Sequence, residues 1–174
     1  MGIAARGNFD LTQHSEHSGK NLEYFDSAND IKYLPHVIEP SLGVERLFLA
    51  LLVSNYKEES LPNNDKRTVL SLPPALAPIK VAVFPLLSNK VELQAFAKTV
   101  AQLLRSKYVV EFDSSGAIGR RYRRADEIGI PFCVTIDFDS LKDNTVTIRY
   151  RDSMEQRRIN VDEILTLLGN EIVE

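Results

Sequence analysis

A glycine and an arginine lie three residues apart where a short apolar strand gives way to an apolar helix. The stretch PHVIEPSLGVER covers residues 35–46 and places Arg46 in the first turn of that helix, just after Gly43. A helix N-terminus carries partial positive charge, so a cation there needs a nearby anion. Gly43 permits close backbone approach, the helix N–H groups are free, and Arg46 is a planar bidentate donor. Together these features favour a bound phosphate.

The same residues also fit an ordinary structural ion pair. Glu39 or Glu45 would then neutralise Arg46, because perturbed charges often belong to structural networks. Taken alone, Glu39 is an exposed acid at a strand end and Ser41 is a helix cap. The residues by themselves leave the phosphate site and the ion pair both open.

A second concentration of positive charge is the sequence RRYRR at residues 120–124. On a helix, Arg120 and Arg124 share one face and Arg121 lies on another, with Tyr122 between them. Guanidinium groups suit RNA phosphates, and an aromatic or guanidinium plane stacks on an unpaired base. The alternative is a solvated helix face whose charge is offset by the acids that follow, Asp126 and Glu127.

Further along the chain, TIRYRDSMEQRR alternates so that Arg149 and Arg151 share one face of a strand. They join Arg120, Arg121 and Arg124 as candidate contacts to a nucleic acid. The spacing of His14 and His17 could suit a metal, but no cysteine or further histidine completes a site. We therefore expect no metal site.

These residues need particular elements to position them. Residues 1–55 begin with a strand end and an extended loop, continue into a strand that ends at Pro40, and finish with an apolar helix in SLGVERLFLALLVSN. Such a small set of elements buries too little surface to be stable alone. We expect residues 1–55 to be the tail end of a larger domain, and residues 56–74, rich in charge and turn signals, to be a linker.

From residue 75 onward, strand and helix alternate. The buried strand in IKVAVFPL precedes the amphipathic helix in KVELQAFAKTVAQLLRSK, the strand YVVEFD and a polar helix ended by Gly129. The strand IPFCVTIDF, a turn at LKDN, the strands TVTIRYRD and EQRRIN, and a final helix complete the pattern. This order predicts an α/β domain over residues 75–174, with a mixed sheet, right-handed crossovers, an antiparallel edge and flanking helices.

The composition is that of a soluble globular protein. The 174 residues are 44% hydrophobic and 26% charged, and the net charge of -3 argues against binding nucleic acid by bulk charge alone. The single cysteine, Cys133, excludes a disulfide framework, and no stretch approaches the ~20 apolar residues of a membrane span. We expect a cytoplasmic protein without a membrane partner.

Three segments, in order, resemble the later part of the homodimeric glycyl-tRNA synthetases. They are GIAARGNFDLTQHSEHSGKNLEYFD, PHVIEPSLGVERLFLALL and DSSGAIGRRYRRADEIGIPFCVTIDFDSLKDNTVTIRYRDSMEQ. The resemblance covers nearly the whole chain. It implies an incomplete class II catalytic sheet segment followed by an anticodon-binding domain with a mixed sheet flanked by helices.

The resemblance also implies roles for the residues. IEPSLGVERLFLALL, at residues 38–52, is similar to class II motif 3, which makes Arg46, with Glu39, a binder of ATP. Glu39 and Ser41 would bind glycine, whose selection requires filled walls that exclude an added methyl group. Arg6 lies in a segment similar to one beside the family's active site, and it is equally well read as a surface arginine.

The family activates glycine with ATP and magnesium and transfers it to tRNA as a homodimer. Motifs 1 and 2 of class II synthetases have no counterpart in this sequence, so we expect a C-terminal fragment that does not form the adenylate by itself. Two other classes stay open. One is a non-enzymatic synthetase-like paralogue that serves as an RNA-binding or polymerase accessory module, and the other is an autonomous RNA-binding regulator.

Overall fold

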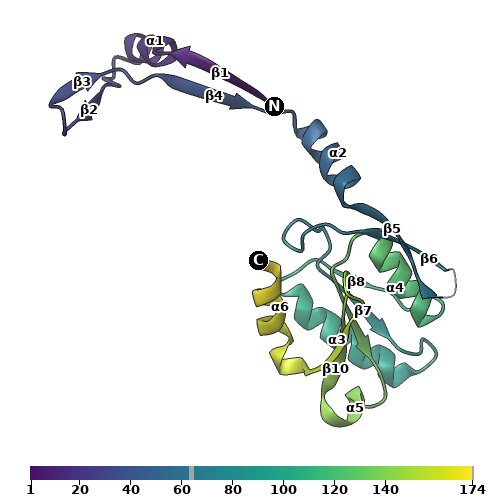
Figure 1. The fold of residues 1–174 in the computed structure, drawn as a ribbon. Coiled ribbons are helices and arrows are strands. Elements are labelled where there is room, and N and C mark those ends of the chain that lie inside the picture. Colours follow the sequence, from purple (N-terminus) through teal and green to yellow (C-terminus); the bar gives the residue numbers. More distant parts are fainter. Residues whose placement is uncertain (63–64, 174) are drawn as a thin grey trace. The chain divides into compact units, whose positions relative to one another are not determined.

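The computed structural model describes residues 1–62 and 65–173 of the chain, and the chain divides into two compact units, Met1–Ala50 and Leu51–Glu174. Figure 1 shows the fold of each unit. The boundary therefore lies within a helix rather than in an irregular linker. In the part that the structure describes, no helix is both long and apolar enough to span a membrane.

The first unit consists of two small antiparallel pairs, one complete helix and the first part of a second helix. Strand β1 (Gly2–Gly7) pairs with β4 (Val37–Ser41), and β2 (Tyr24–Asp26) pairs with β3 (Ile31–Tyr33). Helix α1 (Phe9–Ser18) follows β1, and α2 (Val44–Asn55) follows β4. The strand-turn-helix predicted from the sequence is confirmed in β4 and α2.

Helix α1 replaces the extended loop that we expected in this segment. The Asn8 carbonyl accepts from both the backbone N–H and the hydroxyl of Thr12, and Gly19 closes the helix in the left-handed conformation at φ 66°. Few of its residues are apolar, so it shows no helical hydrophobic period. Its ends are set by these hydrogen bonds and by the glycine, which a search for periodicity does not detect.

No residue of the first unit is buried. Large apolar side chains stay open to solvent along α2 and β4, with Val44 73%, Phe48 61% and Ile38 70% exposed. A unit of this size without buried side chains has no hydrophobic core of its own. That these residues are part of a larger domain stays a prediction.

After the end of α2, the second unit contains a hairpin within the segment that we expected to be a linker. Strand β5 (Tyr56–Ser60) pairs antiparallel with β6 (Lys66–Leu70), and Arg67 and Val69 of β6 are buried. The alternation of buried and exposed residues along β6 is that of an ordinary strand. The charged and turn-forming residues nearby concealed it, because a buried arginine does not count toward an apolar pattern.

The main sheet has five strands in the order β11-β10-β9-β7-β8. Strand β7 (Val81–Pro85) runs parallel to β8 (Val110–Phe112) and β9 (Phe132–Ile136), while β10 (Thr145–Tyr150) pairs antiparallel with both β9 and β11 (Gln156–Asn160). The predicted mixed sheet with an antiparallel edge is confirmed. The expected turn at LKDN forms a short helix, α5 (Ser140–Asp143).

Helices cover the two faces of this sheet. Val81 and Val83 of β7 face a core that includes α3 (Val91–Arg105) and α6 (Ile164–Val173), the latter preceded by the 3₁₀ turn η2 (Val161–Glu163). Ala82 and Phe84 face the opposite way, toward α4 (Ile118–Glu127). Helix α4 also packs against β6 of the hairpin. The arginine-rich helix is therefore placed between the sheet and the hairpin.

Gly129 provides a test of how the hairpin meets α4. Its φ of +82° lies in the left-handed region, and an added Cβ would stand 3.0 Å from the backbone oxygen of Leu70. We expect Gly129→Ala to lower the free energy of unfolding by about 2 kcal/mol through backbone strain and crowding.

Gly119→Ala, within α4, is the matched control for urea unfolding. A Cβ at Gly119 meets nothing within 4 Å, so this change should be neutral or should stabilise by up to about 0.5 kcal/mol. Equal unfolding midpoints for the two variants would contradict the close approach of hairpin and helix.

Candidate functional site

The first unit presents the predicted substrate residues on an open surface. In the pairing of β1 with β4, Glu39 lies opposite Ala4 and Ser41 opposite Gly2. Because side chains two residues apart in a strand point to the same face, Glu39 and Ser41 share one side of the pair. The hydroxyl of Ser41 lies close over Gly2, where an added Cβ would be 3.1 Å from Oγ.

Arg46 lies in the first turn of α2, with its aliphatic stem over Gly43. A Cβ at Gly43 would meet the Cβ, Cγ and Cδ atoms of Arg46 at 3.8 to 4.0 Å. The Gly43 carbonyl accepts the N–H of Leu47 at 3.0 Å. Among the described residues, Arg46 has no ion-pair or hydrogen-bond partner for its guanidinium, so the ion pair with Glu39 or Glu45 does not form here. The guanidinium is therefore free to meet a ligand.

Arg6, rather than Arg46, lies beside the acids of this unit. Its Nε and Nη2 donate to the Asp10 carboxylate at 3.0 and 2.8 Å, and Nε lies 3.5 Å from Glu39 Oε2. The hydrogen bond with Asp10 and its negative charge raise the pKa of Arg6, and the same hydrogen bond lowers the pKa of Asp10. Arg6 thus connects β1 with the start of α1 and with the strand that carries Glu39.

In the second unit, three of the five candidate RNA-binding arginines are buried. Arg121, Arg149 and Arg151 are 1%, 5% and 1% exposed. The Arg121 guanidinium donates to the carbonyls of Pro85 and Gly116, which fixes the loop before α4, and burial lowers its pKa. Side chains placed in this way hold the fold together and cannot stack on an RNA base in this conformation.

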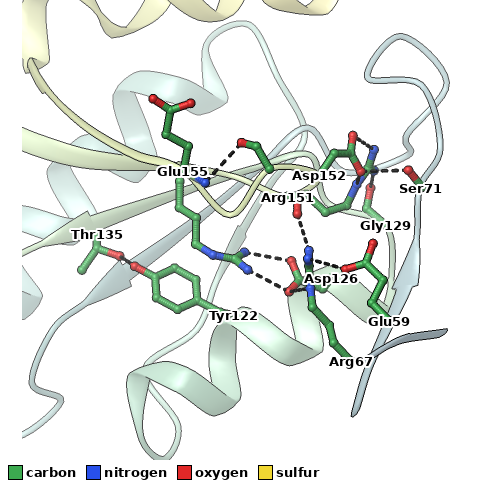
Figure 2. A network of polar contacts seen from close by, with 12 residues as sticks. Glu59, Arg67, Ser71, Tyr122, Asp126, Gly129, Thr135, Arg151, Asp152 and Glu155 are labelled. Atoms are coloured by element: carbon green, nitrogen blue, oxygen red, sulfur yellow. Dashed lines mark hydrogen bonds and ion pairs between the residues drawn. The ribbon is translucent and has the colours of Figure 1, made fainter. Parts of the chain in front are cut away.

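Arg151 is used in the same way. Its guanidinium donates to the carbonyl of Gly129 at 3.0 Å and to that of Leu72 at 2.7 Å, and it also binds the Asp152 carboxylate at 2.8 Å. Figure 2 shows Ser71 on the other side of Asp152, and the Ser71 hydroxyl donates to that carboxylate at 2.8 Å. Arg151 thus joins the end of α4 to the segment that follows the hairpin.

Arg149 binds a carboxylate at the centre of the unit. Its two terminal nitrogens donate to Asp126 at 2.9 and 3.1 Å, and Arg67 Nε donates to the same carboxylate at 2.8 Å. Figure 2 shows Asp126 beside Arg67, which also reaches Glu59 of β5 at 2.9 Å. Burial by itself would lower the pKa of Arg149. The hydrogen bonds to Asp126 raise that pKa by more, so the net effect is a raised pKa. Two cations are thereby balanced by two carboxylates.

The remaining arginines of α4 are exposed. Arg124 donates to the Asp113 carboxylate and to the Ser115 carbonyl, and Arg123 pairs with Asp65 at the start of the hairpin's second strand. Arg120 is exposed, and no described residue pairs with its guanidinium. Of the five candidate arginines, Arg120 and Arg124 are the ones exposed to solvent. An RNA backbone can therefore contact these two.

One of the two interpretations of RRYRR made Asp126 an exposed acid that offsets the arginines, and for Asp126 this is wrong. The carboxylate is 1% exposed. A usable signal was present in the spacing of this helix. One face has the spacing of a buried helix face and includes an arginine; its residues are Ile118, Arg121, Tyr122 and Ala125. That face would have predicted at least Arg121 as buried. The partner of Asp126 on β6 lies 59 residues away and could not be inferred from any local spacing.

The mixed sheet and its helices identify the second unit. Residues 80–171 match the family described as "anticodon binding domain". The chain belongs to this family. The match to the family begins after the β5–β6 hairpin. In the structure, Arg67 nevertheless joins this hairpin to the domain.

Curated relatives extend the similarity across the chain. It is 54% identical over 172 residues to a glycine–tRNA ligase of Mycolicibacterium vanbaalenii, covering 97% of this chain and 36% of the relative. It is 51% identical to that of Cutibacterium acnes, covering 99% and 37%, and 52% identical to that of Clostridium tetani, covering 98% and 36%. The chain thus spans little more than a third of the length of these relatives.

Solved structures agree on the fold. The RNA binding domain of a threonyl-tRNA synthetase from Cryptosporidium parvum Iowa II superposes with a TM-score of 0.52 at 25% identity, covering 58% of this chain and 25% of that chain. A prolyl-tRNA synthetase from Cryptosporidium parvum gives a TM-score of 0.53 at 24% identity, covering 59% and 23%. Both support the architecture of the anticodon-binding domain.

The buried carboxylate gives a direct test of this architecture. Asp126→Asn leaves the shape intact and places two buried guanidinium groups against a neutral amide, so we expect a loss of about 3 kcal/mol in the free energy of unfolding. Urea unfolding followed by circular dichroism measures it.

Asp139→Asn is the control, because Asp139 binds Lys142 in an exposed pair with its carboxyl side chain 64% accessible. Exposed pairs contribute little, and the expected change is below about 0.5 kcal/mol. A similarly small effect at Asp126 would mean that the hairpin is not held by this carboxylate.

Proposed function

We propose that the chain is part of a glycine–tRNA ligase and that its second unit binds the anticodon of glycine tRNA. The observation that carries the proposal is the identity of 51 to 54% with glycine–tRNA ligases over almost the whole chain. The match of residues 80–171 to the anticodon-binding family supports tRNA as the partner. The parent reaction would attach glycine to tRNA at the expense of ATP.

The charge distribution supports a local RNA contact. The chain carries a net charge of -3, so an RNA would be held by particular cations rather than by the overall charge. Arg120 and Arg124 on the exposed side of α4 are the two predicted arginines in a position to bind phosphates. Arg121, Arg149 and Arg151 act indirectly in this proposal, because they fix the helix and strands that carry the surface.

We further propose that Arg46, with Glu39, binds ATP and that Glu39 and Ser41 bind glycine in the parent enzyme. The free guanidinium of Arg46, the Gly43 turn and the start of the twelve-residue helix α2 form a suitable cradle for phosphate. Glu39 and Ser41 share one face of β4, where a carboxylate can accept from an ammonium group. Magnesium would come with the nucleotide as its counter-ion.

The exposed apolar faces of the first unit support its place in a larger catalytic domain, which in the parent enzyme would be a homodimer. Val44 and Phe48 of α2 are strongly exposed, and burying such side chains is worth about 1.5 to 3 kcal/mol each. Glu39, Ser41 and Arg46 also favour the ligase over a synthetase-like accessory module, because such a module has no use for substrate-binding residues. A cytoplasmic location follows from this proposal.

Binding to glycine tRNA tests the second unit. We expect the 174-residue chain to bind a fluorescein-labelled glycine tRNA transcript at least tenfold more tightly than a transcript in which the two anticodon bases that pair with the GG of glycine codons are changed to UU. Fluorescence anisotropy at fixed salt measures both dissociation constants. Equal affinities would contradict anticodon recognition and favour a general RNA-binding protein.

Pyrophosphate exchange tests the first unit. We expect the purified 174-residue chain to show no glycine-dependent exchange of pyrophosphate into ATP, because Glu39, Ser41 and Arg46 lie on an open surface that neither orients the reactants nor excludes water. A full-length glycine–tRNA ligase assayed in parallel is the positive control. Exchange above background by the chain would show that the substrate site is complete within it.

A further inference from the structure

An apolar groove lies between α4 and β8, the strand at one edge of the five-stranded sheet. Its volume is about 290 Å³, and we call it the edge groove. Ala82 and Phe84 of β7, together with Ala125 of α4 and Ile130, form a floor that belongs to one apolar cluster. Ile128 also lines the groove and is 51% exposed. Apolar surface therefore reaches solvent at this edge of the sheet.

The edge groove carries more negative charge than its own cations match. Asp113 is paired, because Arg124 Nε donates to its carboxylate at 3.1 Å. Arg121 is 1% exposed and donates to backbone carbonyls, so its charge is held within the wall. Glu111 and Glu127 line the groove and are exposed, and among the described residues neither carboxylate has a hydrogen-bond or ion-pair partner. The groove therefore favours a cation and disfavours a phosphate.

The backbone of β8 adds a second binding feature beside the groove. The Val109 carbonyl and the Asp113 N–H form hydrogen bonds, at 3.0 and 3.3 Å, to β7 and the residue before it. Backbone groups of successive residues in a strand point to opposite sides, so those of Val110 and Phe112 point away from β7. Within the described residues no strand pairs with them there. Such an edge accepts a further extended strand.

The register of β8 determines which side chains an added strand would meet. Glu111 pairs with Ala82, so its side chain lies on the α4 face, over the edge groove. Val110 and Phe112 lie on the other face and pack against the main core. Every second residue of an added strand would therefore lie over the groove, and the residues between would extend the apolar face. Lysine or arginine suits the first set, because its aliphatic stem covers apolar surface while its charge reaches the carboxylates.

The same carboxylates argue against two other occupants. If β8 of a second copy paired antiparallel with this edge about its central residue, Glu111 would lie opposite Glu111, and like charges in that position are destabilising. An RNA strand would bring its phosphates toward Glu111 and Glu127, which have no cation to neutralise them. A basic polypeptide meets neither penalty.

We propose that the edge groove binds an extended segment of a partner protein in which basic and apolar residues alternate. The segment adds to the sheet beside β8, with its basic side chains over the apolar floor and near Glu111 and Glu127. Backbone hydrogen bonds to Val110 and Phe112 hold it in register. This gives the second unit a protein-binding surface in addition to the proposed contact with RNA, and it does not depend on that contact.

The test uses the full 174-residue chain and a fluorescein-labelled eight-residue peptide of alternating lysine and valine, followed by fluorescence anisotropy at fixed low salt. We expect the peptide to bind, and Glu111→Gln to weaken binding about threefold. Glu92→Gln is the matched control, because it removes the same charge from an exposed position on α3. It should leave the affinity unchanged. Failure of the unmodified peptide to bind, or equal effects of the two variants, would overturn the inference.

Two modified peptides separate strand addition from simple charge attraction. One carries N-methyl groups on every lysine nitrogen and the other on every valine nitrogen, so each blocks the backbone N–H groups along one side of the strand. We expect one pattern to weaken binding about tenfold and the other to leave it within threefold, because only one side pairs with β8. Equal affinities for the two patterns would mean that no strand is added. Dimerisation of the chain that Glu111→Gln strengthens would identify a second copy as the occupant and would likewise refute the proposal.

Discussion

The second unit depends on one buried carboxylate, that of Asp126. It accepts from Arg67 on the hairpin and from Arg149 on the sheet, and Glu59 balances the remaining positive charge. An unpaired charge at this depth would cost several kcal/mol, so hairpin, helix and sheet are held in the arrangement that keeps all the partners in place. Charge pairing, rather than apolar contact alone, specifies how these three elements meet.

This constraint explains why an arginine-rich helix exposes only part of its charge. Arg121 fixes the loop before α4, Arg149 binds the buried carboxylate of Asp126, and Arg151 binds the backbone carbonyl of Leu72. Arg120 and Arg124 stay at the surface. The separation leaves a rigid frame of buried guanidinium groups and two exposed ones, as the proposed contacts to phosphates require.

The first unit is not stabilised by a core, because none of its residues is buried. Backbone pairing of β1 with β4 aligns Glu39 and Ser41, and the Gly43 turn places Arg46 over the start of α2. Hydrogen bonds and turn chemistry therefore define local geometry there, while the apolar surface of α2 stays uncovered. The residues proposed to bind substrate can therefore be in register without a completed site around them.

The sequence alone determined the order of elements from residue 75 onward, the mixed sheet, and the strand-turn-helix of β4 and α2. Each of these depends on apolar periodicity or on a glycine signal, and both are local. The sequence also pointed to Arg46, whose guanidinium stays free in the described structure. It did not reveal α1 or the β5–β6 hairpin, because polar residues and a buried arginine conceal their patterns.

Only the tertiary structure decided which arginines are interior. Asp126 lies 23 residues from Arg149 and 59 from Arg67, and a charged side chain is buried only where a partner from another element neutralises it. No spacing within a helix or strand contains that information.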